Sequence, residues 1–255
     1  MRQFGLIGFP LSHSFSKGFF TEKFLKENIA DVQYENYPID TIHAFSSVWE
    51  NTNLEGLNVT IPYKKEVIAF IQHPSSVVSA INACNCIRKF NTELYGYNTD
   101  VVGFEKSILP LLKPSHNKAL ILGTGGAAAA VEWVLQKLAI PYQMVSRNPS
   151  AIASKFNAPV LSYQALNEDI VHEHTLIINT SPIGMYPHVQ EAPMMPYEAI
   201  GSGHYLYDLV YNPTETLFLT KGKEKGAVIK NGLDMLHLQA LESWAIWNAA
   251  TPPIQ

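Results

Sequence analysis

The chain has 255 residues, of which 47% are hydrophobic and 16% are charged, and its formal net charge at pH 7 is −4. A chain of this length can bury roughly three-quarters of its unfolded surface, and this composition is typical of a globular protein with one large domain or two small ones. Lysine and arginine form no long cluster, which argues against nucleic acid or an anionic membrane as a partner.

The sequence also argues against a membrane segment, a disulfide and a metal site. No apolar run is long enough to span a bilayer, and the first residues lead directly into a predicted strand. Cys84 and Cys86 lie two apart in one predicted strand, so they share a face and we expect them to stay reduced, as in a cytoplasmic protein. No cysteine or acid cluster joins His172 and His174, the closest histidine pair, so we expect no metal.

The first half of the chain alternates predicted strands and helices, which favours an α/β unit with a mainly parallel sheet. We expect strands at residues 3–8, 32–39, 54–60, 84–90 and 93–97. We expect helices at residues 17–27, after Asp40, after Pro62 and at residues 101–112. Asp40 is the expected N-cap of the second helix, and Pro62 suits the first position of the third.

Three polar groups follow strands in this half, where open α/β sheets bind ligands. Ser14 and Ser16 could hold a carboxylate at a helix start, or could simply cap that helix. Lys64 stands near the positive end of a predicted helix, a poor place for a structural cation, so a role in proton transfer competes with that of a solvated lysine like Lys65. Asp100 could cap a helix, or could pair with Lys64 as acid and base.

A glycine-rich turn divides the chain near its middle. Residues 119–122 form an apolar run typical of a strand buried on both faces, and residues 127–138 have helical periodicity. Between them Gly123 permits a tight turn, Gly125 lets a ligand approach the backbone, and Ala128 takes the third small position of a dinucleotide fingerprint. We therefore expect a pyrophosphate at this helix start; a turn that only packs a helix onto a strand is the alternative.

The next predicted strand, residues 142–145, ends in Ser146 and Arg147 without the acid that grips a ribose 2′-hydroxyl. An arginine and small polar groups suit a 2′-phosphate, which favours NADP(H) over NAD(H), with a plain surface arginine as the alternative. Further strands are expected at residues 159–161, 176–179, 205–210 and 227–229. Thr214 is the expected cap of the helix that follows it.

The motifs, taken in order, resemble those of the shikimate dehydrogenase family. That family carries Ser-x-Ser, Asn-Val-Thr-x-Pro-x-Lys, Ala-x-Asn, Asn-Thr-Asp and Gly-x-Gly-Gly-Ala. This chain has them at residues 14–16, 58–64, 83–85, 98–100 and 123–127. Each motif alone is weakly specific, but five in the same order over nearly the whole chain are highly specific. Cys84, Cys86 and the Ser-Arg-Asn at residues 146–148 depart from the family pattern, and the last departure lowers the expected preference for NADP.

The resemblance implies two α/β domains with the active-site cleft between them. Residues 1–112, joined by a C-terminal helix at residues 233–255, would form a substrate-binding and catalytic domain with a mainly parallel sheet. Residues 118–232 would form a Rossmann-like NADP-binding domain. We expect a monomer or homodimer with no nucleic-acid or membrane partner.

The resemblance also implies a reaction and its residues. The reaction would be the reversible reduction of 3-dehydroshikimate to shikimate by NADPH, with Lys64 and Asp100 as the catalytic pair. The implied substrate-binding residues are Ser14, Ser16, Thr60, Lys64, Asn85, Asp100, Tyr211 and Gln239. The implied cofactor-binding residues are Gly123, Thr124, Gly125, Gly126, Ala127, Ser146, Arg147, Leu209 and Gly232.

Three alternatives stay open. A quinate/shikimate dehydrogenase that uses NAD is the nearest. A non-catalytic dinucleotide- or metabolite-sensing protein on the same scaffold is the second, although a sensor would not need both Lys64 and Asp100. A Rossmann oxidoreductase with an unrelated substrate is the third, and it leaves the motifs of the first half unexplained.

Overall fold

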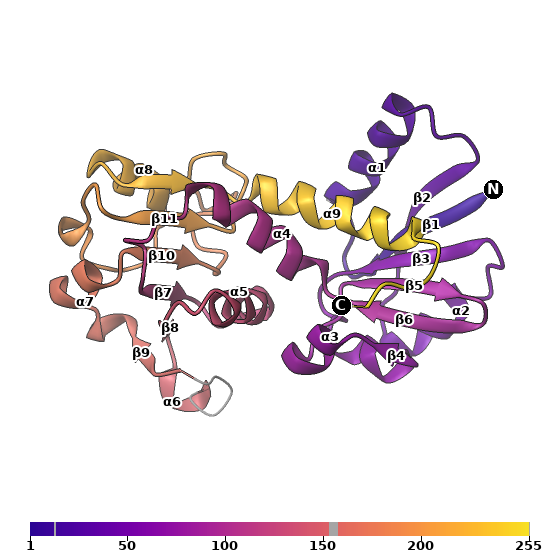
Figure 1. Ribbon diagram of the computed structural model, residues 1–255, viewed down its shortest axis with the longest axis horizontal. Helices are drawn as coiled ribbons and strands as arrows, with labels where there is room; N and C mark the ends of the chain where they lie inside the picture. Colours follow the sequence, from indigo (N-terminus) through magenta and orange to yellow (C-terminus); the bar gives the residue numbers. More distant parts are fainter. Residues whose placement is uncertain (13, 153–157, 255) are drawn as a thin grey trace. The chain divides into compact units, whose positions relative to one another are not determined.

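The computed structural model describes residues 1–12, 14–152 and 158–254, which group into two compact units (Figure 1). The first unit comprises Met1–Thr99 and Ala240–Gln255, and the second comprises Asp100–Gln239. Each unit contains one six-stranded sheet within the described residues. Most strand pairs are parallel and helices alternate with strands, so the predicted α/β class is confirmed.

The sheet of the first unit has the order β2-β1-β3-β5-β6-β4. Its strands are β1 (Arg2–Gly8), β2 (Val32–Pro38), β3 (Leu54–Val59), β4 (His73–Pro74), β5 (Cys86–Phe90) and β6 (Glu93–Tyr97). β2, β1 and β3 are parallel, and β5 runs antiparallel to β3. A tight turn at Asn91 joins β5 to β6 as an antiparallel hairpin. The helices are α1 (Phe15–Lys26), α2 (Phe45–Val48) and α3 (Ser76–Ile81), with 3-10 turns at Ile42–Ala44 and Glu66–Phe70.

Successive residues of β1 point to opposite faces of this sheet, and each face packs against a hydrophobic core. Ile7 belongs to a core with Phe45 of α2. Leu6 belongs to a second core with Phe20 of α1 and with Trp247, near the end of α9 (Leu233–Asn248). The end of α9 is therefore part of the core of the first unit.

Trp247 fixes the end of α9 against the sheet. Its ring stacks on Phe4 with centroids 4.7 Å apart, and its Nε1–H donates to the Ile87 carbonyl at 2.9 Å. A Cβ added at Gly56 would lie 2.3 Å from the Trp247 ring nitrogen, so only glycine admits this approach. The glycine and the tryptophan, far apart in the sequence, thus depend on each other.

Arg88 of β5 closes the same helix end. Its buried guanidinium donates to the carbonyls of Ile246, Thr251 and Ala249 at 2.9, 3.1 and 2.6 Å. The last carbonyls of a helix have no partner within the helix, so this arginine supplies the donors that the end of α9 lacks.

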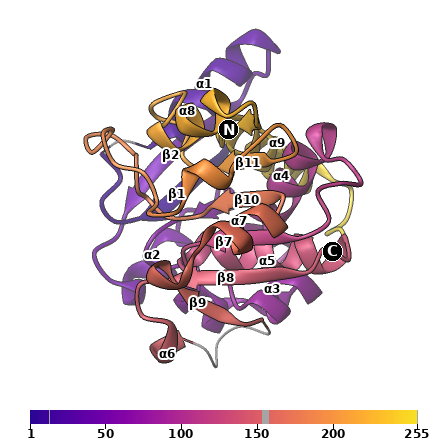
Figure 2. The ribbon, with the colours of Figure 1, turned by 90° about the vertical axis from the view of Figure 1, so that its left-hand side faces the viewer.

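The sheet of the second unit has the order β12-β11-β10-β7-β8-β9, and its neighbouring strands are all parallel. The strands are β7 (Ala119–Leu122), β8 (Tyr142–Ser146), β9 (Val160–Ser162), β10 (Leu176–Asn179), β11 (Tyr205–Asp208) and β12 (Val228–Lys230). Figure 2 shows β10, β7, β8 and β9 side by side. This is the doubly wound order of dinucleotide-binding folds, and it reverses between β7 and β10.

Helices cover both faces of the second sheet. They are α4 (Thr99–Ile108), α5 (Gly126–Lys137), α6 (Pro149–Ile152), α7 (Glu168–Glu173), α8 (Leu217–Glu224) and the first part of α9. Tyr207 of β11 reaches α4, where its ring lies 5.1 Å from Phe104 and its hydroxyl 2.6 Å from Ser107. Leu206, on the opposite face, packs against Gly222 of α8. Burial on both faces explains why these strands read as continuous apolar runs.

The first boundary between the compact units lies earlier in the chain than predicted, and the second boundary lies later. The predicted boundaries fall at residues 112 and 233, whereas the division between the units falls at residues 99–100 and 239–240. α4 groups with the second unit because Phe104 and Ser107 pack on Tyr207.

Three local expectations were wrong. Residues 61–65 form turns rather than a helix, because the Lys64 carbonyl accepts from the Cys84 N–H at 2.7 Å. Thr41 rather than Asp40 caps the turn that follows it, through a bond from the His43 N–H. Thr216 rather than Thr214 caps α8.

Replacement of Arg88 by methionine keeps the aliphatic stem but removes the three donors at the end of α9. We expect the free energy of unfolding to fall by about 3 kcal/mol, because hydrogen bonds from a charged group are worth more than neutral ones. Urea denaturation followed by tryptophan fluorescence measures this loss.

Lys17→Met is the control, because Lys17 makes a half-exposed ion pair with Glu35 that is worth at most about 1 kcal/mol. An Arg88→Met loss no larger than that of the control would show that the cap of α9 contributes little.

Candidate active site

The loops that follow β1 and β3 run together at the carboxyl edge of the first sheet. The Thr60 N–H donates to the Ile7 carbonyl at 3.0 Å, and the Phe9 N–H donates to the Ile61 carbonyl at 3.1 Å. A Cβ added at Gly8 would lie 2.4 Å from the Thr60 methyl carbon. Thr60, a predicted substrate residue, is therefore held beside the start of the loop that leads to α1.

Ser14 has the position of an N-cap but does not act as one. It precedes α1, yet its side chain makes no capping hydrogen bond. Its Oγ is buried and has no hydrogen-bond partner within the described residues. Because a buried hydroxyl without a partner costs free energy, simple capping does not account for this serine, whereas a ligand oxygen would satisfy it.

Ser16 and Asn85 are joined through a buried polar network. The Ser16 hydroxyl bonds to the Tyr34 hydroxyl, which in turn donates to Asn58 Oδ1 at 2.9 Å. Asn58 Nδ2 donates to Ser243 Oγ at 2.9 Å and to the Asn85 carbonyl at 3.3 Å. Burial raises the pKa of Tyr34, so its hydroxyl remains a neutral donor.

This network sets the orientation of the Asn85 amide. Asn85 Oδ1 accepts from the Thr99 N–H at 2.6 Å and from the Thr99 hydroxyl at 3.3 Å. With its oxygen occupied, the side chain has its Nδ2 group left to offer a ligand, which suits a hydroxyl or carbonyl oxygen. The Thr99 hydroxyl also lies 3.3 Å from Ser243 Oγ. Ser243 was not predicted from the sequence, although it lies one helical turn beyond Gln239 and so on the same helix face.

Lys64 and Lys65 are not equivalent. Lys64 is half-buried, whereas Lys65 is exposed. Burial raises the pKa of the neighbouring Cys84 thiol to about 12, and the charge of Lys64 opposes that rise. Both cysteines are free thiols, as expected. Since residues 61–65 form turns, the environment of Lys64 comes from this burial and not from a helix terminus.

Asp100 stands in the first turn of α4 and is half-buried. It is the first residue of the second unit, whereas Lys64 belongs to the first. The pairing of these two side chains stays a prediction.

The glycine loop after β7 separates two kinds of glycine. Gly123 has φ +107°, and a Cβ there would lie 3.0 Å from Thr180 Oγ1, so its backbone requires glycine. A Cβ at Gly125 or Gly126 would meet nothing within 4 Å. Gly125 is the N-cap of α5, without a side-chain cap, and no acid lies in the first turn. Gly125 and Gly126 thus leave open space at a helix start, and such a space suits an anion. Thr124 lies between Gly123 and Gly125, and Ala127 follows Gly126.

The segment after β8 offers a cation and no acid. Ser146 is buried, and its Oγ accepts from the Asn148 N–H at 3.2 Å. Arg147 is exposed and lies near enough to Tyr163 to lower the pKa of that phenol, which burial raises. An exposed guanidinium at the end of the second Rossmann strand suits a 2′-phosphate.

The loops after β10, β11 and β12 are in direct contact. A Cβ at Gly232 would lie 2.1 Å from the Leu209 carbonyl oxygen, and the Gly232 N–H donates to the Val210 carbonyl at 3.2 Å. The Leu209 N–H donates to the Asn179 carbonyl at 2.9 Å. The structure therefore brings together Leu209 and Gly232, two predicted cofactor residues, with the 38% exposed Tyr211 two residues further on.

Gln239 lies on α9, where its Nε2 group donates to the Leu236 carbonyl at 2.9 Å. Its Cβ packs closely against Gly103 of α4, where an added Cβ would lie 3.0 Å away. Small size at residue 103 therefore decides how close Gln239 comes to α4.

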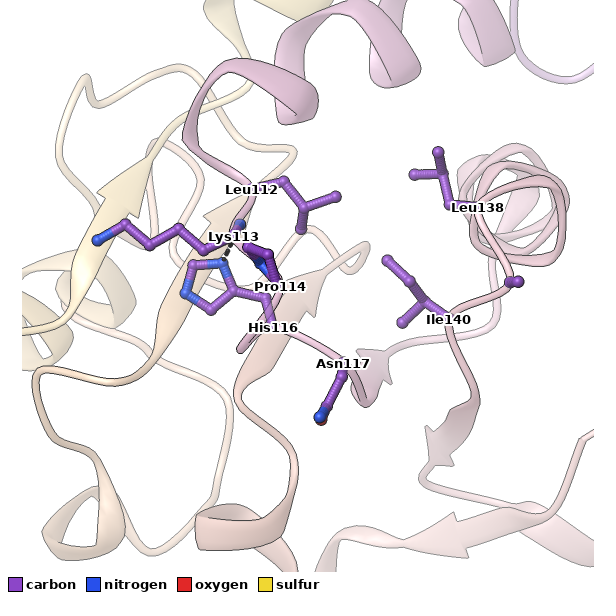
Figure 3. A pocket seen from close by; sticks show the side chains of 8 residues that line it. Leu112, Lys113, Pro114, His116, Asn117, Leu138 and Ile140 are labelled. Carbon is purple, nitrogen blue, oxygen red and sulfur yellow. Dashed lines mark hydrogen bonds between the residues drawn. The ribbon is translucent and has the colours of Figure 1, made fainter.

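A pocket of about 370 Å³ lies at the opposite edge of the second sheet (Figure 3). It is lined by Leu112, Lys113, Pro114, His116, Asn117, Leu138, Ala139 and Ile140. These residues precede β7 and β8, whereas doubly wound sheets bind cofactors at the carboxyl ends of their strands. His116 Nδ1 accepts from the Lys113 N–H at 3.0 Å, so the ring stabilises the turn at residues 113–116. None of the predicted site residues lines this pocket.

Within the described part of the chain, no three histidine, cysteine or acidic side chains are grouped as metal ligands would be. No helix in that part is long and apolar enough to cross a bilayer.

Comparisons with known proteins agree with these features. The family model described as "Shikimate dehydrogenase substrate binding domain" matches residues 6–87. A shikimate dehydrogenase (NADP(+)) from Methanococcus maripaludis is 35% identical over 98% of this chain and 93% of its own length. The structure of shikimate 5-dehydrogenase from Thermus thermophilus, in complex with NADP(H) and shikimate, is 26% identical, with a TM-score of 0.85 over 99% of this chain and 95% of that one. Quinate dehydrogenase from Corynebacterium glutamicum, in complex with NAD, shares the fold with a TM-score of 0.87 at 23% identity, over 99% and 95% of the two chains.

Gly125→Ala tests whether the open space before α5 holds a ligand. The added methyl meets no protein atom within 4 Å, so we expect the variant to fold with a stability loss of at most about 1 kcal/mol from the poorer N-cap. We expect at least about tenfold weaker dinucleotide binding, because the methyl takes the place of the ligand. Calorimetric titration measures the affinity. Gly201→Ala, equally unobstructed, is the control and should bind normally; equal affinities would place the ligand elsewhere.

Asp208 gives the stability a predictable pH dependence. Burial raises its pKa from 3.8 to about 6, and bonds from Thr216, Val210 and Asn179 only partly offset that rise. The folded state therefore keeps a proton between about pH 4 and 6 that the unfolded chain has released, so stability falls as pH rises through this window, by on the order of 3 kcal/mol.

Asp208→Asn removes this titration. We expect the wild type to lose stability relative to the variant as pH rises from about 4 to 6, and the difference to stay constant above about pH 7. Urea denaturation of both proteins across this range measures the difference. A difference that does not change with pH would mean that the carboxyl group titrates normally.

Proposed function

The chain belongs to the shikimate dehydrogenase family, and on that premise we propose that it catalyses the reversible reduction of 3-dehydroshikimate to shikimate by NADPH. The observation that carries the proposal is the set of polar groups at the carboxyl edge of the first sheet. There Ser14 has a buried hydroxyl without a described partner, and Asn85 has its amide oriented as a donor. Lys64 lies in the loop after β3, at the same edge, and is half-buried.

The substrate carries one carboxylate and several ring oxygens, and the proposed residues match them in kind. Ser14 and Ser16 would bind the carboxylate. Thr60, Asn85 and Asp100 would bind ring oxygens. Tyr211 and Gln239 complete the proposed set. Hydroxyl and amide groups suit a polyhydroxylated ring, since each can be satisfied by a ligand hydroxyl.

Lys64 and Asp100 are the proposed catalytic pair. Reduction of a ketone generates negative charge on its oxygen, and the Lys64 ammonium can stabilise that charge and donate a proton to the oxygen. In the reverse direction the amine accepts the hydroxyl proton. Asp100 would keep the ammonium in place and bind the neighbouring hydroxyl.

The cofactor residues fit a dinucleotide phosphate. The open, uncapped start of α5, at Gly125 and Gly126, would hold the pyrophosphate, and Arg147 with Ser146 would hold the 2′-phosphate. Thr124 and Ala127 flank the pyrophosphate site, and Gly123 keeps the turn tight. Leu209 and Gly232 would face the nicotinamide end. NADPH, when bound, supplies the hydride.

A quinate/shikimate dehydrogenase that uses NAD is the second candidate. The likeness to quinate dehydrogenase, at 23% identity, bears on the fold alone and does not favour quinate. The absence of an acid at the end of β8 counts against NAD. Oxidation of shikimate with NADP and with NAD, with quinate as the competing substrate, tests the proposal. Faster turnover of quinate with NAD than of shikimate with NADP would favour the second candidate over the first. A protein that binds both ligands without turnover would be a sensor.

Lys64→Met should keep the fold and the affinity for NADP but lower kcat by about 10²- to 10⁴-fold, the usual contribution of general acid–base catalysis. Steady-state kinetics measures kcat, and calorimetry measures the affinity. Lys65→Met, at the exposed neighbour, is the matched control and should turn over normally. Near-normal turnover by Lys64→Met would remove this lysine from the mechanism.

Arg147→Leu should weaken NADP binding by about tenfold and leave NAD binding unchanged, because only NADP has the 2′-phosphate that a guanidinium binds. The two affinities of this one variant control for each other. Equal loss for both cofactors would mean that Arg147 acts on the loop and not on the phosphate.

A further inference from the structure

A buried carboxylate in the second unit has no role in the proposed chemistry. Asp208 ends β11, is fully buried, and lies opposite Asn179 in the register of β11 with β10. Its Oδ1 accepts from Asn179 Nδ2 at 2.9 Å and from the Val210 N–H at 3.0 Å, and its Oδ2 accepts from the Thr216 hydroxyl at 2.5 Å. Three neutral donors from three places in the chain therefore converge on one carboxylate.

These bonds connect the two ends of the loop between β11 and α8 through the Asp208 carboxylate. Val210 lies at the start of that loop and Thr216 at its end, where Thr216 also caps α8 through the Leu219 N–H. Leu209 and Tyr211 flank Val210, so the bond to its N–H sets the backbone that carries both residues. The Asn231 side chain, which donates to the Thr214 carbonyl at 2.7 Å, supports the same loop from the next strand.

Asn179 extends the arrangement to the loop after β10. Its Nδ2 group, held by Asp208, also donates to the Ile183 carbonyl at 3.3 Å, and its Oδ1 accepts from the N–H and the hydroxyl of Ser181 at 3.0 and 2.7 Å. Ser181 in turn lies next to Gly123, where an added Cβ would be 3.1 Å from the Ser181 N–H nitrogen. Through one amide, Asp208 is thus connected to the glycine loop.

We propose that Asp208 is a positioning residue that sets the loops after β10 and β11 for cofactor and substrate binding. The inference rests on the proposed function, since it assigns Leu209 to the cofactor and Tyr211 to the substrate. A carboxylate is required because it offers acceptors on both oxygens, whereas a neutral amide offers one. Without it, two buried donors and the N-cap of α8 lose their partner, and the loops lose their common attachment.

Asp208→Ala gives the direct test. In the folded variant at pH 8, we expect the Kd for NADP and the KM for shikimate each to rise at least about tenfold, with a smaller change in kcat. Tyr207→Phe is the matched control: it removes the neighbouring buried hydroxyl bond to Ser107, so it lowers stability but leaves both constants unchanged. Constants within about twofold of the wild type in folded Asp208→Ala would overturn the proposal.

Asp208→Asn keeps the test available if the alanine variant does not fold. Asparagine retains the oxygen for Asn179 and Val210 but turns a donor toward Thr216, which then lacks an acceptor for its own proton. We expect the variant to bind NADP about threefold more weakly than the wild type at pH 8, with the ratio approaching one below about pH 6, where the wild-type carboxyl is protonated and resembles the amide.

The titratable groups that face Asp208 are Tyr197 and Tyr207, whose pKa values burial raises, so both stay neutral over this range. A ratio of one at pH 8 would overturn the proposal. NADP affinity is measured without turnover, so these outcomes remain readable if wild-type protein fails to oxidise shikimate; that failure would count against the proposed function alone.

Discussion

A buried side-chain amide at the carboxyl end of a central strand organises each unit. Asn58, at the end of β3, connects Tyr34, Ser243 and the Asn85 backbone. Asn179, at the end of β10, connects Asp208 with the turn after it. An amide in a dry interior must find partners for its donors and its acceptor, so the loops that supply those partners are held together by the same requirement.

The end of α9 is part of the core of the first unit, although most of that unit comes from the first 99 residues of the chain. Trp247 fills the space that Gly56 leaves, Arg88 supplies donors to the helix end, and Ser243 completes the hydrogen bonds of Asn58. Packing, capping and polar satisfaction therefore act on successive turns of one helix.

The three glycines of the loop after β7 look alike in the sequence motif, but their surroundings differ in the structure. Gly123 is demanded by its backbone angle and by the close Ser181. Gly125 and Gly126 face open space and have no steric need of the protein's own to be glycine. The space that they leave at the start of α5 is consistent with the proposed pyrophosphate site.

The sequence by itself determined the α/β class, the glycine turn before α5 and the order of polar motifs at strand ends, because periodicity and turn chemistry are local properties. It did not determine which hydroxyl caps a helix or how a buried amide is oriented. Ser14 has the position of a cap without the bond, Thr216 caps α8 in place of Thr214, and Asn85 is oriented by Thr99. Such partners are chosen by the tertiary structure: Asn58 and Ser243 lie 185 residues apart, a distance over which no local pattern carries information.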